Sequence, residues 1–160
     1  MNIFTLIVAF CSAISSIAAV IVSALALIRT KQIAKTNLFV ELRKSHAEVH
    51  AQMDPRYHDA SWDLRTEPAA LRTLERYWLQ TFTEWYATTL LNKGAFADVW
   101  DEFLARAVAG GMRNRPLLIA LWGMMYGQPG SSFSGFRKEF GDAIECIYKK
   151  HHHKELRDSI

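Results

Sequence analysis

The chain has 160 residues, half of them hydrophobic, and its 19 Lys and Arg against 16 Asp and Glu give a net charge of +3. This length predicts one domain with an additional segment, and the small basic excess argues against a nucleic-acid-binding surface. The two cysteines, Cys11 and Cys146, exclude a disulfide framework and agree with a reducing compartment.

The first feature along the chain is an uncharged segment of 26 residues, Ile3 to Ile28, which is followed by Arg29. A helix needs about 20 apolar residues to cross a bilayer, so this segment is long enough to span one with some tilt. A signal peptide is disfavoured, because no Lys or Arg precedes the segment and the apolar part exceeds the usual length of about 7–15 residues. Residues 1–28 are therefore predicted to form a transmembrane anchor.

Basic residues follow the anchor closely, at Arg29, Lys31, Lys35, Arg43 and Lys44. By the positive-inside rule they predict an N-terminus outside and the remaining residues in the cytoplasm, at the inner membrane of a bacterium. The same side chains are candidates for contact with anionic lipid headgroups. A role in setting topology alone is the simpler interpretation.

Small residues recur every three or four positions along the anchor, on one face of a helix, at Ala9, Ser12, Ser16, Ala19, Ser23 and Ala26. Such a face lets helices approach closely in lipid, where packing drives association. The small-residue face therefore predicts contact with a membrane helix of another subunit or of a second copy. Chance is the alternative, because 11 of the 26 residues are Ala, Ser or Cys.

The helical pattern continues beyond the anchor, because no Gly or Pro occurs before Pro55. Residues 29–53 are predicted to form a basic juxtamembrane helix, and a loop is expected from there to Pro68. Apolar residues at helical spacing then predict four helices, over about 68–92, 95–109, 116–127 and 131–147. Their expected caps and stops are Thr66, Gly94, Asn114, Gly127 and Ser131 or Ser132.

The predicted fold class is all-α, because no segment has the alternating pattern of a strand. One transmembrane helix extends into a long juxtamembrane helix and is followed by a small cytoplasmic helical bundle over 54–150. Residues 151–160 are predicted to form a polar tail. The second predicted helix buries one face, formed by Leu71, Leu74, Trp78, Phe82, Trp85 and Thr89.

Motifs for catalysis or metal binding are weak. His46 and His50 are four residues apart and share a helix face, as a metal-binding pair would, but solvated side chains are the expected outcome. The segment GGMRNRP, residues 110–116, precedes a predicted helix and is either an anion site or a simple loop. No nucleotide-binding or hydrolase motif occurs. Neither a metal, a cofactor nor an enzymatic activity is therefore expected.

All five tryptophans lie beyond the anchor, at Trp62, Trp78, Trp85, Trp100 and Trp122. Several occupy predicted core positions, but a bundle of this size can hardly bury all of them. Aromatic residues and Met are enriched at the centres of interfaces. Trp62 and Trp122, with Met124 and Met125, are therefore predicted to contact a partner.

The layout resembles a class of uncharacterised bacterial single-span proteins with a short helical domain. The resemblance rests on LALIRTKQIAKTNLFVELRK, FTEWYATTLLNKGAF and ALWGMMYGQPGSSFSGFRKEF, and it implies no activity. The leading hypothesis is a non-enzymatic accessory or scaffold subunit of a larger inner-membrane complex. The alternative is a membrane-tethered stress- or phage-defence signalling effector that homo-oligomerises, and an enzyme acting on lipid headgroups is a third hypothesis.

Overall fold

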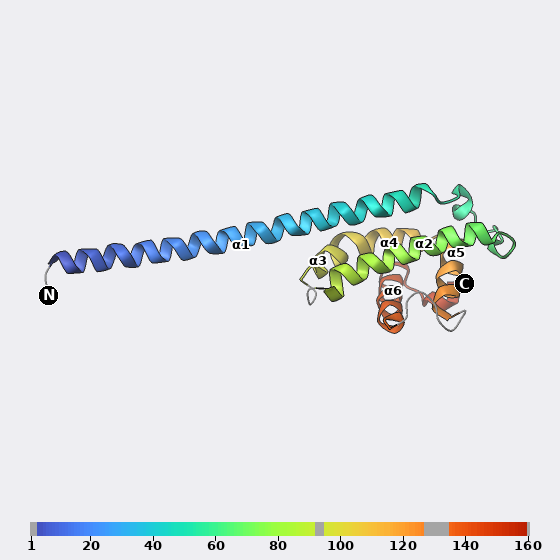
Figure 1. The fold of residues 1–160 in the computed structure, drawn as a ribbon. Coiled ribbons are helices and arrows are strands. Elements are labelled where there is room, and N and C mark those ends of the chain that lie inside the picture. Colours follow the sequence, from blue (N-terminus) through green and yellow to red (C-terminus); the bar gives the residue numbers. More distant parts are fainter. Residues whose placement is uncertain (1–2, 92–94, 127–134, 160) are drawn as a thin grey trace. The chain divides into compact units, whose positions relative to one another are not determined.

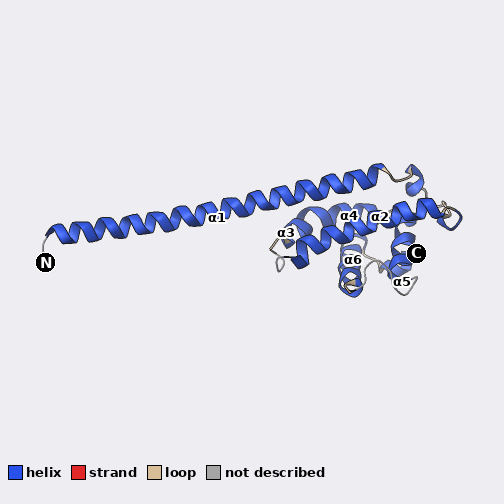
Figure 2. Cartoon of the chain, viewed as in Figure 1, coloured by secondary structure: helices blue, strands red, loops and turns tan. Residues whose placement is uncertain are grey.

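The structure is a computed structural model that describes residues 3–91, 95–126 and 135–159 (Figure 1). All regular elements in these residues are helical and none is a strand, which confirms the predicted all-α class (Figure 2). The chain divides into two compact units, Met1–Val40 and Glu41–Ile160. The second unit is called the helical domain below.

Helix α1 extends over Ile3–Ala51 without a break, which confirms one long apolar N-terminal helix. It is continuous because it contains neither Gly nor Pro. Its part from Ile14 to Ala51 includes a stretch with a mean hydropathy of 1.6 and no buried residues. By length and composition, this helix can cross a membrane.

In the described residues, the helical domain contains the last turns of α1 and five further α-helices. The α-helices after α1 are α2 (Pro68–Trp85), α3 (Ala97–Val99), α4 (Ala105–Gly111), α5 (Arg115–Tyr126) and α6 (Arg137–His152). Two π-helical turns, η3 (Tyr86–Leu90) and η5 (Trp100–Leu104), extend α2 and join α3 to α4. The described 3₁₀ turns include η1 (Pro55–His58), η2 (Leu64–Thr66) and η6 (Leu156–Ser159).

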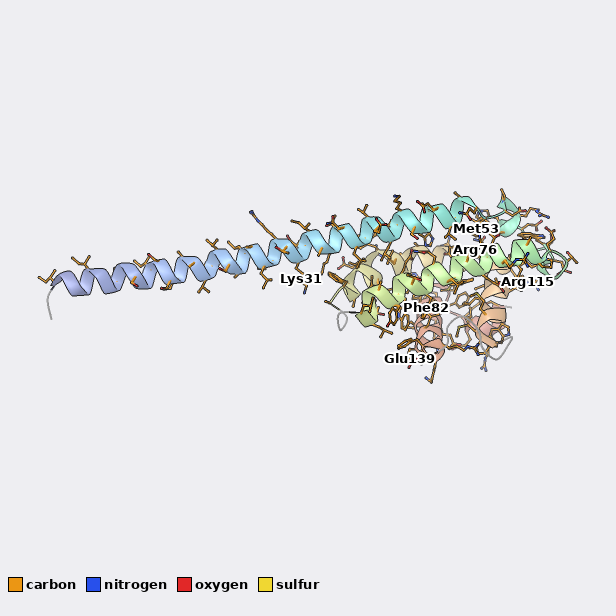
Figure 3. All side chains as sticks on the ribbon, in the orientation of Figure 1. Lys31, Met53, Arg76, Phe82, Arg115 and Glu139 are labelled. Carbon is orange, nitrogen blue, oxygen red and sulfur yellow. The ribbon has the colours of Figure 1, made fainter. Side chains whose placement is uncertain are left out.

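The core of the helical domain is built around α2. Trp78 has no exposed surface, and its indole N–H donates a hydrogen bond of 2.7 Å to the carbonyl oxygen of Leu117 on α5. Phe140 of α6 packs edge-on against Phe82, with ring centroids 5.3 Å apart (Figure 3). Of the six residues predicted for the inner face of α2, Leu74, Trp78 and Trp85 are buried, whereas Leu71, Phe82 and Thr89 are half-buried.

Several local predictions differ from the structure. The segment expected to be a loop before Pro68 contains the turns η1 and η2, and Asp54 caps η1 by accepting a hydrogen bond from the backbone N–H of Arg56. Thr66 is not the cap of α2, because its hydroxyl donates to the carbonyl of Asp63 and Glu67 occupies the cap position. The expected stops and start at Gly94, Gly127, Ser131 and Ser132 lie outside the described residues.

The C-terminal residues also differ from the predicted polar tail. Helix α6 ends at His152, and His153 follows it in the left-handed conformation, with φ 57°. Leu156 is then buried in the domain, and the Tyr148 hydroxyl donates to the Ser159 hydroxyl oxygen at 2.7 Å. Because one apolar side chain anchors this turn, residues 151–159 belong to the folded domain.

Candidate functional site

A pocket of about 440 Å³ opens in the helical domain. Its walls come from the last turns of α1, from η1, and from α2, α4 and α5. The polar part of the lining consists of Arg43, His46, His50, Tyr57, His58, Tyr77 and Asn114. Among the described residues, no Asp or Glu lines it. Its volume is within the usual range for small-molecule sites.

His46, which lines the pocket, belongs to a buried histidine–carboxylate pair. The ring nitrogen Nδ1 of His46 is 3.0 Å from Oε1 of Glu84, and the two residues are 8% and 1% exposed. The same Glu84 oxygen accepts a bond of 3.3 Å from Gln80, whose own amide oxygen accepts from Ser45 at 3.0 Å. A buried carboxylate requires such partners because burial without them is costly. The network therefore fixes the orientation of the His46 ring.

The other two histidines of the pocket are also held by one ring nitrogen each. Nε2 of His50 is 2.9 Å from the Tyr57 hydroxyl, and Nδ1 of His58 is 3.1 Å from the side-chain oxygen of Asn114. The rings of Tyr57 and His58 pack together, with centroids 3.8 Å apart. Each of the three imidazoles thus has one nitrogen fixed by the protein, and in the described chain the other makes no hydrogen bond.

Tyr77 forms part of the pocket wall and is only 3% exposed. Burial raises the pKa of its hydroxyl well above the ordinary value, and the negative charge of Glu84 raises it further, whereas the positive charge of Arg43 lowers it. The hydroxyl is therefore a neutral hydrogen-bonding group at physiological pH.

Two adjacent glycines at the end of α4 give a test of the packing at the pocket wall. A Cβ atom at Gly111 would lie 2.5 Å from the Tyr77 hydroxyl oxygen, while one at Gly110 would meet no atom within 4 Å. We expect Gly111→Ala to lower the free energy of unfolding by about 1–3 kcal/mol through overpacking. Gly110→Ala is expected to be neutral or stabilising by up to about 1 kcal/mol.

Urea unfolding of the detergent-solubilised full chain measures both variants. In a Tyr77→Phe background the clashing oxygen is gone and the next ring atom is 3.4 Å away. The cost of Gly111→Ala should then fall below about 1 kcal/mol. An equal cost with and without the hydroxyl would contradict this explanation of Gly111.

The structure brings together residues that the sequence left separate. His46 and His50 both line the pocket, as do Gly110, Gly111 and Asn114 from the GGMRNRP segment. The expectation that His46 is solvated was wrong, because Glu84 pairs with it in the interior. In the described residues, no three His, Cys, Asp or Glu side chains are arranged to hold a metal ion.

The residues predicted to face lipid lie mostly on the surface. Arg29, Lys31 and Lys44 are exposed and Lys35 is half-buried, whereas Arg43 lines the pocket; Figure 3 labels Lys31 on α1. Of the small-residue face, the side chain of Ala9 is not described, and the exposed members are Ser12, Ser16, Ala19, Ser23 and Ala26. Contact with headgroups or with a membrane helix stays a prediction for both sets.

The four residues predicted to contact a partner differ in exposure. Met124 and Met125 are buried in the helical domain. Trp62 is covered too: its N–H donates to Glu67 at 3.0 Å, and the guanidinium of Arg56 lies 4.5 Å from its ring centroid. Only Trp122 of the four is half-buried, with its ring 4.3 Å from that of Tyr126. Contact with a partner stays a prediction, and of these four residues Trp122 has the side chain that a partner could reach.

Sequence reasoning did not identify Glu84, Tyr77, Tyr57 or His58 as site residues. One signal was present in α2, where polar residues follow helical spacing beside the apolar face, at Tyr77, Thr81, Glu84 and Thr88. All four are buried. No family model, curated protein or solved structure matches the chain.

Proposed function

We propose that the protein is a non-enzymatic accessory subunit of a larger assembly in the bacterial inner membrane. In this proposal α1 packs against other membrane helices, and the helical domain docks on the cytoplasmic side. The observation that carries the proposal is the apolar surface of α1, whose described side chains from Ile14 to Ile28 are all exposed. Lipid and neighbouring helices are the surroundings that suit such a surface.

The hydroxyl groups of α1 support packing in a membrane. Ser16 donates to the carbonyl of Ser12 at 2.9 Å, and Ser23 donates to that of Ala19 at 2.8 Å. Because these bonds stay within the helix, the hydroxyls need no partner from outside it. The small-residue face therefore presents little unsatisfied polarity to a neighbouring helix.

A pair of matched double variants tests the proposal. Ala19→Leu with Ser23→Leu adds bulk to the small-residue face, whereas Ala18→Leu with Ala24→Leu adds it elsewhere. At 100° per residue, each control position lies about 120° from the centre of the tested pair. The first variant should weaken association with the partner about tenfold, which corresponds to about 1.4 kcal/mol of binding free energy. The control variant should bind the partner as the wild type does.

The measurement is the native mass in a mild detergent, with mass spectrometry of the proteins that co-migrate. A large stoichiometric assembly that is lost only in the first variant supports the proposal. A wild-type protein that migrates without other subunits would contradict it.

A second candidate is a membrane-tethered signalling effector that homo-oligomerises. The pocket favours it, because a polar cavity of ligand size suits a domain that responds to a small molecule. The described pocket lining holds no Ser, Thr or Cys that could act as a nucleophile, which favours binding over covalent catalysis. In the native-mass experiment, a homo-oligomer without other subunits would favour this candidate.

A further inference from the structure

We propose that the pocket between the end of α1, η1, α2, α4 and α5 binds the phosphate group of an anionic ligand. Four basic side chains, Arg43, His46, His50 and His58, line it, and no acidic side chain does so among the described residues. The inference is independent of the membrane partner, because all the residues that carry it lie in the helical domain.

The charge of Arg43 is not neutralised within the described part of the chain. Arg43 is exposed and lines the pocket, and in these residues it forms no ion pair or hydrogen bond. The other arginine near η1, Arg56, pairs with both Asp54 and Glu67 at 2.7 Å. A guanidinium group without a carboxylate partner at a pocket suits recognition of phosphate oxygens.

One carboxylate, that of Glu84, contacts the lining residue His46 without lining the pocket itself. Glu84 is buried behind His46 and accepts from the His46 ring and from Gln80. Because Nδ1 of the His46 ring is bound to Glu84, Nε2 is the ring nitrogen left to contact a ligand.

The distribution of the hydrogen-bonding groups around the pocket favours phosphate over carboxylate. The groups come from three elements and from the turn before α5: Arg43 and His46 from α1, His58 from η1, Tyr77 from α2, and Asn114 from that turn. A tetrahedral phosphate can accept from several sides at once, whereas a planar carboxylate accepts mainly in its own plane. Helix α5, with 12 residues, also begins next to Asn114, and the start of a helix favours negative charge.

The phosphate group could belong to inorganic phosphate or to a phospholipid headgroup, and one experiment distinguishes these two ligands. The probe is the ¹H–¹⁵N NMR spectrum of the histidine rings in the full chain, in nanodiscs at constant ionic strength in chloride. One arm titrates inorganic phosphate in nanodiscs of phosphatidylcholine. The other replaces part of that lipid with phosphatidylglycerol and adds no phosphate.

Saturable shifts of the His46 and His58 ring signals are expected in one arm, which then identifies the source. Arg43→Ala should weaken the response at least about tenfold, since hydrogen bonds to charged groups contribute about that factor or more. Arg43→Lys should recover part of it. Arg106→Ala is the matched control, because Arg106 is an exposed arginine outside the pocket lining, and it should leave the response unchanged.

Two results would overturn the inference. The first is an absence of saturable shifts in both arms. The second is an equal loss of the response in Arg43→Ala and Arg106→Ala, because this would show a general effect of surface charge rather than a site. Circular dichroism of each variant confirms that the helical domain is folded.

Discussion

Replacing Glu84 with alanine is expected to lower the free energy of unfolding of the helical domain by about 3–5 kcal/mol. The carboxylate is buried, and its removal leaves the ring nitrogen Nδ1 of His46 and the side-chain amide of Gln80 without their shared acceptor. A buried polar group without a partner retains the full cost of leaving water. Since a domain of this size has about 5–15 kcal/mol of stability in total, the variant should be close to unfolding.

The conservative variant Glu84→Gln separates the hydrogen bond from the charge. A glutamine side-chain oxygen can still accept from His46, so we expect this variant to lose less than half as much stability as Glu84→Ala. Glu102→Ala is the matched control, because Glu102 is exposed, and it should change stability by less than about 0.5 kcal/mol.

Urea unfolding of the detergent-solubilised chain, followed by tryptophan fluorescence, measures all three variants. Every tryptophan lies beyond residue 60, so the signal reports on the helical domain and not on the apolar part of α1. If Glu84→Ala cost no more than Glu102→Ala, the His46–Glu84 pair would not contribute to the core.

The fold could be predicted largely because the signals for helices are local. The absence of Gly and Pro before Pro55 predicts a continuous α1, and the apolar spacing in α2 predicts which face Trp78 occupies. The π-helical turns η3 and η5 have no comparable signal, since each differs from an α-helix by a single additional residue in the turn. The C-terminal turn was missed because Leu156 is the one apolar residue among residues 151–159, and a single apolar residue gives no helical spacing.

The pocket could not be predicted in the same way, because its residues come from segments far apart in the sequence. His46 and Glu84 are 38 residues apart, and His58 and Asn114 are 56 apart. Helical spacing indicates which face of a helix is buried, but it does not indicate which other helix covers that face. A glutamate among buried positions is nevertheless informative: Glu84 must have a partner, and a nearby histidine is one of the few side chains that can provide it.

The second large effect concerns Trp78, and Trp78→Ala is expected to lower the free energy of unfolding by about 3–5 kcal/mol. The ring has no exposed surface, and its N–H bond to the Leu117 carbonyl joins α2 to α5. Trp78→Phe retains most of the apolar contact but loses that bond, so about 1–3 kcal/mol of the loss should remain. The same fluorescence measurement applies, with circular dichroism as a second signal because a tryptophan is removed.

Trp122→Ala makes the same chemical change where the ring is half-buried, so its cost in unfolding free energy should be less than half that of Trp78→Ala.

Trp122→Ala also tests whether Trp122 contacts a partner. A tryptophan that contributes to an interface should be needed more for association than for folding. Trp122→Ala should therefore reduce the co-migrating partner in the native-mass experiment while the domain stays folded. If Trp122→Ala destabilised the domain as much as Trp78→Ala, Trp122 would belong to the core, and the partner surface would have to lie elsewhere.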